Sequence, residues 1–177
     1  MSVTYPLGFR ARGVQAGLRT KPAPDLALIV NDGPRDTVAG VFTTNRVSAA
    51  PVQWSRQVVS DHKARAVIAN AAVANACTGI DGLTDSQCEA EHVATLVGCQ
   101  TDEVVVASTG VIGVRLDMPS ILVGATTAHT SLDRGDAVDE SAARAIMTTD
   151  TVPKSATVER NGTRFGGIAK GAGMLAP

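Results

Sequence analysis

Three short segments of the sequence combine glycines or threonines with side chains that could take part in acyl chemistry. Ser108-Thr109-Gly110 follows an apolar run, Thr148-Thr149-Asp150 follows a helical pattern, and Lys170 stands in the glycine-rich segment 166–173. Glycine permits backbone conformations and close approaches that other residues resist, so such segments often present a side chain or backbone N–H groups to a ligand. The elements around them must hold these three segments in place.

Thr109 and Gly110 are candidates for an oxyanion hole. A strand that ends in Ser-Thr-Gly can leave backbone N–H groups and a hydroxyl exposed, and such donors stabilise the oxyanion of an acyl-transfer intermediate. The same residues are common where a strand simply turns, and the residues alone favour that structural interpretation. Likewise, Thr148 and its neighbours alone favour capping and turn roles after a helix.

A lysine between glycines also occurs in phosphate-binding loops, but Lys170 does not fit that motif. Gly171 stands where a serine or threonine should follow the lysine, and the spacing of the preceding glycines differs. The sequence therefore excludes a nucleotide-binding loop of this kind.

The sequence predicts no metal site, no bound cofactor and no nucleophile of its own. Cys88 and His92 are four residues apart, but no third ligand lies nearby, which favours a core or boundary pair over a metal site. His62 and His129 have no convincing catalytic partners, and no Gly-x-Ser-x-Gly motif or paired carboxylates are present.

Composition excludes several classes of protein. The chain has 177 residues, 44% of them hydrophobic and 19% charged, which fits one globular domain spanning 1–177. A net charge of −1 and an aromatic content of 3% argue against nucleic-acid or anionic-membrane binding. The sequence has no apolar run of ~20 residues and no signal-peptide pattern, so we expect a cytoplasmic protein. Cys77, Cys88 and Cys99 are expected to be buried thiols.

Strand and helix patterns alternate along the chain, which predicts a mixed α/β (α+β) fold. Helices are expected from Thr84, where the spacing fits a capping box, and over 117–129 and 139–147. Pro51 admits at most an edge strand. A hairpin is expected between 25–30 and 37–43, and Asn161-Gly162 predicts a second one near the end of the chain. The strands are expected at 7–14, 25–30, 37–43, 65–69, 103–107, 156–159 and 163–168.

Four motifs in order along the chain carry a resemblance to one family. They are Asn75-Ala76-Cys77-Thr78-Gly79, Ser108-Thr109-Gly110-Val111-Ile112-Gly113, Ala145-Ile146-Met147-Thr148-Thr149-Asp150-Thr151 and Ile168-Ala169-Lys170-Gly171-Ala172-Gly173-Met174-Leu175-Ala176-Pro177. Together they resemble the α chain of the ornithine acetyltransferases (glutamate N-acetyltransferases) of arginine biosynthesis, over about residues 8–177. One segment differs, because the family usually has Asn-Ser-Gly where this chain has Asn70, Ala71 and Ala72. The missing glycine bears on the geometry of that turn.

The resemblance implies a self-processing enzyme of the N-terminal-nucleophile type. In that family the precursor cuts itself before a threonine, which becomes the nucleophile at the start of a partner β chain, and two α and two β chains assemble. The apolar end of this chain, residues 174–177, is expected to lead into the partner. The implied fold is a layered sandwich with helices outside and sheets within, completed by the second chain.

The resemblance also implies a reaction and the residues for it. Acetyl would pass from N2-acetyl-L-ornithine to L-glutamate through an acetyl-threonine, releasing ornithine and N-acetylglutamate, without metal or cofactor and with acetyl-CoA as a possible second donor. Thr109 and Gly110 would form the oxyanion hole, and Thr148 and Lys170 would bind the substrate. Two other functions stay open: a related self-processing amidase or aminopeptidase that uses water, and a non-catalytic amino-acid-binding subunit whose partner lacks the threonine.

Overall fold

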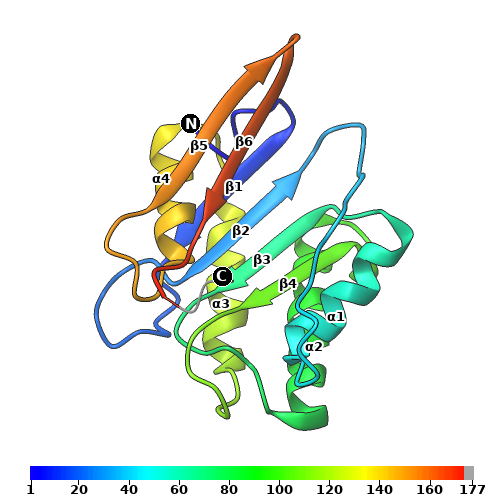
Figure 1. Cartoon of the computed structure of the whole chain (residues 1–177), viewed down its shortest axis with the longest axis vertical. Coiled ribbons are helices and arrows are strands. Elements are labelled where there is room, and N and C mark those ends of the chain that lie inside the picture. Colours follow the sequence, from blue (N-terminus) through cyan, green and yellow to red (C-terminus); the bar gives the residue numbers. More distant parts are fainter. Residues whose placement is uncertain (174–177) are drawn as a thin grey trace.

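A four-stranded sheet forms the centre of the computed structural model, which describes residues 1–173. The strands lie in the order β1 (Phe9–Val14), β2 (Leu26–Asn31), β3 (Ala66–Asn70) and β4 (Val104–Ser108) (Figure 1). β1–β2 and β2–β3 are antiparallel, whereas β3–β4 is parallel. β3 and β4 therefore end at the same edge, where the polar loops after Asn70 and Ser108 lie side by side. The expected apolar end, 174–177, lies outside the described residues.

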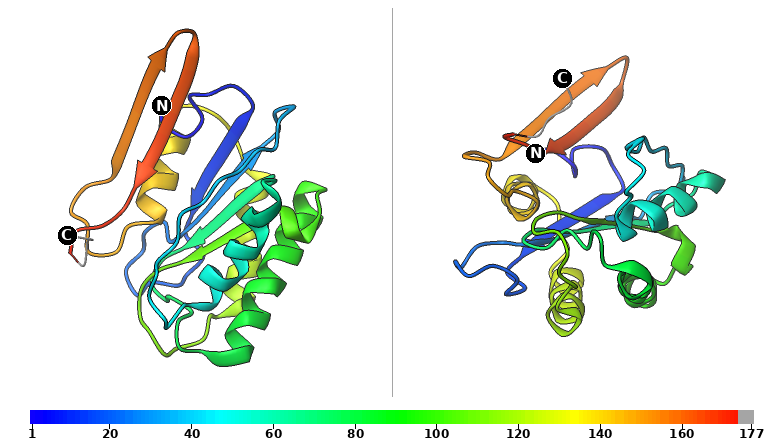
Figure 2. Two further views of the ribbon diagram at one scale, coloured as in Figure 1. Left: turned by 45° about the vertical axis from the view of Figure 1, so that its right-hand side comes forward. Right: turned by 60° about the horizontal axis from the view of Figure 1, so that its bottom comes forward.

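Helices cover both faces of this sheet unequally. α2 (Gly79–Val97) and α3 (Met118–Thr130) pack on one face, and α4 (Asp136–Ala145) covers β1 and β2 on the other (Figure 2). Alternate strand residues point to the α2–α3 side, as the two-residue period of a strand requires. They form the main core with apolar side chains of α2 and α3; its fully buried members include Leu26, Leu28, Ile68, Val93, Val104 and Ile121.

The exposed edge of β4 is closed by α1 (Ala50–Val58), which is followed by the short 3-10 helix η1 (Val59–Asp61). The Trp54 indole N–H donates to the Val104 carbonyl at 3.0 Å. The Ser55 hydroxyl donates to the Val106 carbonyl and accepts from the Val106 amide, at 2.6 and 2.9 Å. These contacts satisfy backbone groups that an edge strand otherwise offers to other chains. A second 3-10 helix, η2 (Thr101–Glu103), leads into β4.

The last two strands form a separate two-stranded sheet. β5 (Lys154–Arg160) and β6 (Thr163–Ala169) pair antiparallel through a turn at Asn161 and Gly162, which both have positive φ. This is the hairpin that the Asn-Gly pair predicts. Nearly every residue of it is exposed, and it extends beyond α4 and β1 on the side opposite α2 and α3 (Figure 2).

The mixed α/β class is confirmed, and so are six of the expected strands and the helices at 117–129 and 139–147, with shifts of a few residues at their ends. The hairpin between 25–30 and 37–43 is wrong. β2 already has β1 on one side and β3 on the other, so segment 37–43 makes only one isolated bridge, Thr37 to Lys63. Pro51 lies in the first turn of α1, where its missing N–H has no helical partner to lose, and not in a strand.

The helix expected around Thr84 is present as α2, but two other expectations about this region are wrong. The helix begins at Gly79, and Thr84 lies inside it, donating its hydroxyl to the Ile80 carbonyl at 3.1 Å instead of capping the start. Cys77 and Cys88 are exposed thiols, and Cys99 is partly exposed. The buried face of α2 is set by Glu89 and Val93, which leaves Cys88 on the solvent side.

No helix within residues 1–173 has the length and hydrophobicity needed to cross a membrane.

Candidate active site

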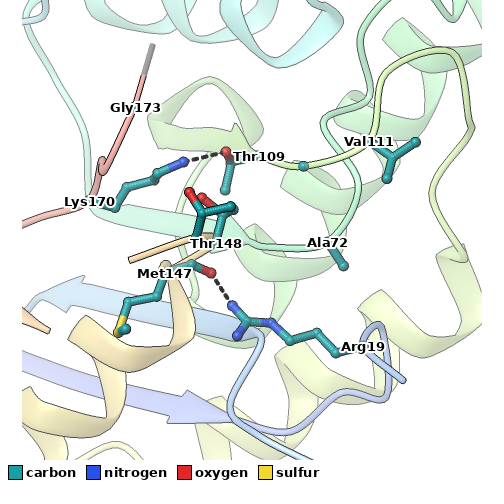
Figure 3. Close-up of a pocket in the computed structure, with 10 residues that line it drawn as sticks. Arg19, Ala72, Thr109, Val111, Met147, Thr148, Lys170 and Gly173 are labelled. Carbon is teal, nitrogen blue, oxygen red and sulfur yellow. Dashed lines mark hydrogen bonds between the residues drawn. The ribbon is translucent and has the colours of Figure 1, made fainter. Parts of the chain in front are cut away.

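The four residues singled out from the sequence lie together around one cavity of about 680 Å³ (Figure 3). Thr109 and Gly110 come from the end of β4, Thr148 from the loop after α4, and Lys170 from the end of β6. The chain thus brings together segments that are up to 61 residues apart. The lining residues are Arg19, Ala72, Thr109, Gly110, Val111, Met147, Thr148, Thr149, Lys170 and Gly173.

Gly110 is held in a conformation and a place that only glycine fits. Its φ is +138°, and a Cβ added to it would lie 2.1 Å from the carbonyl carbon and oxygen of Ala72. The neighbouring amides are already bonded, Thr109 N–H to the Asn70 carbonyl at 3.0 Å and Val111 N–H to the Ala72 carbonyl at 2.8 Å. Within residues 1–173 no hydrogen-bond acceptor is found for the Gly110 amide. The backbone donor available at this turn is therefore Gly110, while Thr109 can offer only its hydroxyl.

Lys170 sets the direction of that hydroxyl. Its Nζ lies 2.8 Å from Thr109 Oγ1 (Figure 3). An ammonium group only donates, so Oγ1 accepts this bond and its own hydrogen is free to point elsewhere. The pair can therefore present a hydroxyl donor and a positive charge to the same ligand, which suits a molecule with a carboxylate and a carbonyl that becomes negative during reaction.

Asp150 joins the loop of Thr148 to the segment of Lys170. Its Oδ2 accepts from the Thr148 amide at 3.2 Å, and its Oδ1 accepts from the Gly171 amide at 2.7 Å. Lys154 donates its ammonium to the same Oδ1. Lys154, and then the Gly171 and Thr148 amides, hold the pKa of Asp150 well below its usual range. The carboxylate is thus ionised throughout the neutral range.

Arg19 lines the cavity and was not found from the sequence. Its guanidinium donates to the carbonyls of Ala145 and Met147, at the C-terminal end of α4. The Asp25 carboxylate holds its loop by accepting from backbone amides, including that of Arg19 at 3.1 Å. Arg19 and Lys170 are two cations in a described lining that contains no acidic side chain, so the cavity suits an anion. No local pattern marks Arg19, because its role depends on where α4 ends in space.

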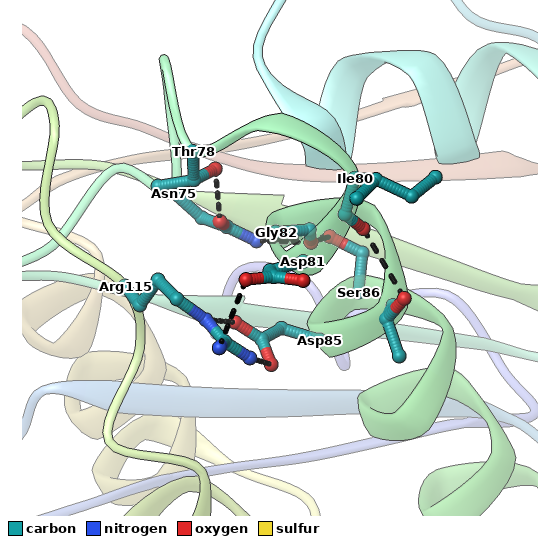
Figure 4. Close-up of polar contacts among 9 residues, drawn as sticks. Asn75, Thr78, Ile80, Asp81, Gly82, Asp85, Ser86 and Arg115 are labelled. Atoms are coloured by element: carbon teal, nitrogen blue, oxygen red, sulfur yellow. Dashed lines mark hydrogen bonds and ion pairs between the residues drawn. The ribbon is translucent and has the colours of Figure 1, made fainter.

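The loop after β3 supports the Gly110 turn and is itself fastened to α2 (Figure 4). Buried Asn75, with φ +46°, donates to the Gly82 carbonyl at 2.8 Å and to the Ser86 hydroxyl at 3.1 Å. Thr78 donates to the Asn75 side-chain oxygen at 2.7 Å. These bonds explain why the Asn-Ala-Cys-Thr-Gly segment is too polar for simple core: its side chains replace the backbone pairing that a strand would provide.

Arg115 fastens the other side of the turn. Its guanidinium makes a bidentate contact with Asp85 at 2.6 and 3.0 Å and reaches Asp81 at 3.4 Å (Figure 4). Both acids are on α2, so the loop that follows Gly110 and the loop that precedes α2 share one support. The hydrogen bonds that Arg115 donates to Asp85 raise the pKa of Arg115.

The Cys88 and His92 pair does not form a metal site in the part of the chain that the structure describes. His92 Nε2 lies 2.9 Å from Thr126 Oγ1 and links α2 to α3. Among residues 1–173 no three His, Cys, Asp or Glu side chains are grouped in a way that could hold a metal ion.

Comparison with known proteins gives one consistent result. A sequence model of the ArgJ family matches residues 10–177. The arginine biosynthesis bifunctional protein ArgJ of Thermobifida fusca is 52% identical over 177 residues, which is all of this chain and 46% of that protein. The protein of the same name from Bifidobacterium longum is 50% identical, with the same coverage. The chain therefore spans about half the length of the curated relatives that it matches.

Two solved structures have the same fold. The ornithine acetyltransferase of Mycobacterium tuberculosis, crystallised with ornithine, is 47% identical with a TM-score of 0.97, and the match covers 99% of this chain and 94% of that chain. The arginine biosynthesis bifunctional protein of Bacillus halodurans is 36% identical with a TM-score of 0.92, covering 100% and 93%.

Proposed function

The chain belongs to the ArgJ family, and on this premise we propose that it is the α-chain part of a glutamate N-acetyltransferase. The enzyme transfers acetyl from N2-acetyl-L-ornithine to L-glutamate in arginine biosynthesis, and releases ornithine and N-acetylglutamate. The observation that carries the proposal is the pairing of Lys170 with Thr109 at 2.8 Å, beside the amide of Gly110, for which residues 1–173 provide no acceptor. This cluster can bind a carboxylate and stabilise an oxyanion in one cavity.

The nucleophile is the N-terminal threonine of a partner β chain. Its α-amino group has an ordinary pKa of about 7.7 to 8.0 and sits next to the hydroxyl, so it can act as the base. The hydroxyl attacks the acetyl carbonyl, and the Gly110 amide and Thr109 hydroxyl donate to the oxyanion that forms. Ornithine leaves, the amine of glutamate attacks the acetyl-threonine, and N-acetylglutamate is released. Thr148 and Lys170 hold the amino-acid part of either substrate.

The partner is a β chain from the same precursor, and this chain is one domain of it. The curated relatives are about twice as long as this chain, whereas the matched chains of the solved structures have nearly its length. That difference supports a precursor that is divided into two chains. The hairpin also exposes apolar Val158 and Phe165, 57% and 51% accessible, which suits burial against another chain. We propose two α and two β chains, located in the cytoplasm.

The experiment expresses the full precursor and assays the purified assembly. We expect a second polypeptide whose first residue is threonine, seen by intact mass and N-terminal sequencing, and parallel double-reciprocal lines for N-acetylornithine and glutamate. A partner without that threonine would make this chain a non-catalytic binding subunit. Release of acetate without glutamate, and no acetyl transfer with it, would make the assembly an amidase. Glutamate with acetyl-CoA alone tests the second donor.

A further inference from the structure

Asp150 lies behind the candidate site, outside the set of side chains that line the cavity. Its side chain has no accessible surface, although it follows a helix end and lies among exposed neighbours. One of its contacts, to the Thr148 amide two residues earlier in the chain, is local. The other backbone contact is different, because the Gly171 amide is 21 residues away in sequence and follows Lys170 directly.

These two amides belong to the two substrate-binding segments. The first amide is that of Thr148 itself. The second is that of Gly171, and it is part of the peptide bond that joins Lys170 to Gly171. A single carboxylate therefore fixes the distance between them. Gly171 has φ +138°, a region that glycine adopts easily, but glycine adopts other conformations just as easily and does not by itself fix the Lys170 segment in this one. An external contact has to select it.

Lys154 neutralises the charge of the Asp150 carboxylate. The Asp150 carboxylate accepts from the amide next to Lys170, and without a counter-ion it would attract the Lys170 ammonium and compete with the ligand. Lys154 occupies Oδ1 of Asp150, while Lys170 bonds the neutral Thr109 hydroxyl at 2.8 Å. The positive charge of Lys170 is therefore left for a substrate carboxylate.

We propose that Asp150 is a positioning residue, which holds the Thr148 and Lys170 segments at the spacing that a substrate carboxylate requires, with Lys154 as its counter-ion. The proposal rests on the proposed function, since it concerns the same substrate site. It assigns no contact between Asp150 and the substrate.

The test compares Asp150→Asn and Asp150→Ala in the full assembly with Asp32→Asn as the matched control. Asp32 is also paired, with Arg10 at 2.6 and 3.0 Å, but lies outside the cavity. An asparagine offers one oxygen, so it keeps one backbone bond and faces the other amide with a donor. We expect KM for N-acetylornithine and for glutamate to rise together by about tenfold for Asp150→Asn and further for Asp150→Ala, the loss of one or two charge-assisted bonds. We expect kcat to change by less than about threefold, and Tm to match that of Asp32→Asn.

Amide hydrogen exchange gives a measurement that needs no activity, and its wild-type part needs no folded variant. The amides of Thr148 and Gly171 should be protected, and should exchange faster in Asp150→Ala. An unprotected Gly171 amide in the wild type would overturn the proposal. So would Asp150 variants that lower Tm and kcat while KM stays at the control value, because that pattern belongs to a purely structural residue. If the wild type transfers no acetyl, the proposed function fails, and the exchange result still decides whether Asp150 holds the Thr148 and Lys170 segments together.

Discussion

The two sheets of the molecule carry different halves of the candidate site, and they are stabilised differently. In the four-stranded sheet, residues such as Leu28, Ile68 and Val106 are at most 2% exposed between the strands and helices α2 and α3. In the β5–β6 hairpin only Ile168 is partly buried. A two-stranded hairpin is marginal in water without a covering layer. The proposed oxyanion donors therefore follow a well-buried sheet, whereas the positions of the residues proposed to bind substrate depend on a few polar contacts.

This difference predicts different kinetic signatures at the two places. Substitutions at the end of β4 should affect the transition state without moving the fold, because the sheet keeps its shape. Substitutions near the open end of the hairpin should affect substrate affinity first, since the position of Lys170 relative to Thr148 depends on the Asp150 contacts.

Thr109→Ala is expected to have the largest effect. Removing one oxyanion donor typically costs roughly 2.7 to 4 kcal/mol, or about 10² to 10³ in kcat. We expect that loss in steady-state kinetics, with Tm unchanged because Thr109 N–H keeps its bond to the Asn70 carbonyl. Thr127→Ala, at an exposed threonine of α3, is the control. Unchanged turnover would leave Thr109 as an ordinary strand end and remove the distinction between the two sheets.

Glu89→Gln tests whether a buried carboxyl group in the helix layer makes the stability of the protein depend on pH. Glu89 is fully buried on α2, neither carboxylate oxygen has a hydrogen-bond partner among residues 1–173, and burial, with a smaller contribution from Asp85, raises its pKa to about 8. The unfolded chain loses this proton near pH 4.5, whereas the folded chain keeps it until about pH 8. The folded state therefore binds more protons between these values, so stability falls as pH rises through that window. The slope is about 1.4 kcal/mol per pH unit, on the order of 3 kcal/mol by pH 7.

The measurement is Tm of the assembly at pH 5, 7 and 8. Glu89→Gln has no ionisation to lose, so the gap between variant and wild type should widen in favour of the variant as pH rises. Glu91→Gln, at an exposed position of the same helix, should show no such change. Parallel Tm curves for wild type and Glu89→Gln would show that Glu89 does not titrate in this window.

Lys170→Ala, at the end of the hairpin, should weaken the use of both substrates. Loss of a hydrogen bond to a charged group is worth about 1.5 to 3 kcal/mol, so the kcat/KM values for N-acetylornithine and glutamate should both fall, by about 10-fold to 150-fold. Lys170→Arg should rescue only part of this, because its planar fork differs from a compact ammonium between glycines. Kinetics with each substrate varied in turn measure both values, with Lys63→Ala as the control. If neither value falls, Lys170 is only a turn residue.

Local patterns were enough for most of the fold. The apolar run before Asn31, the Val-Val-Val run of β4 and the Asn161-Gly162 turn each specify structure over a few residues, and each is confirmed. The hairpin to 37–43 was wrong because the pairing partner of a strand is set by the whole sheet. No local signal in that segment could show that β3 takes the place beside β2.

In the candidate site, too, some residues have a local sequence signal and others do not. Glycine context marked Thr109, Gly110 and Lys170, since unusual backbone geometry leaves a trace in residue type. Arg19 left none, because it reaches the site only through the end of α4. The long-range bond of Asp150 to Gly171 is likewise created by tertiary structure, and locally Asp150 looks like any turn residue.

Ala72→Gly is expected to have the smallest effect, and it tests the link between the loop after β3 and the Gly110 turn. Ala72 has φ +82°, a region that costs a residue with a Cβ about 1 to 2 kcal/mol, and by resemblance the family has glycine here. Glycine relieves that strain but loses about 0.5 to 1 kcal/mol through the greater freedom of the unfolded chain. We therefore expect a net gain of about 0.5 to 1 kcal/mol, seen as a higher Tm.

The matched control for Ala72→Gly is Ala74→Gly, in the same loop but without positive φ. Glycine at position 74 increases the conformational freedom of the unfolded chain and relieves no strain in the folded one, so Tm should fall. The hydrogen bond that the Ala72 carbonyl accepts from the Val111 amide is a backbone contact and survives the change, so kcat should stay at the wild-type value. If both variants lower Tm equally, the positive φ of Ala72 does not strain the loop.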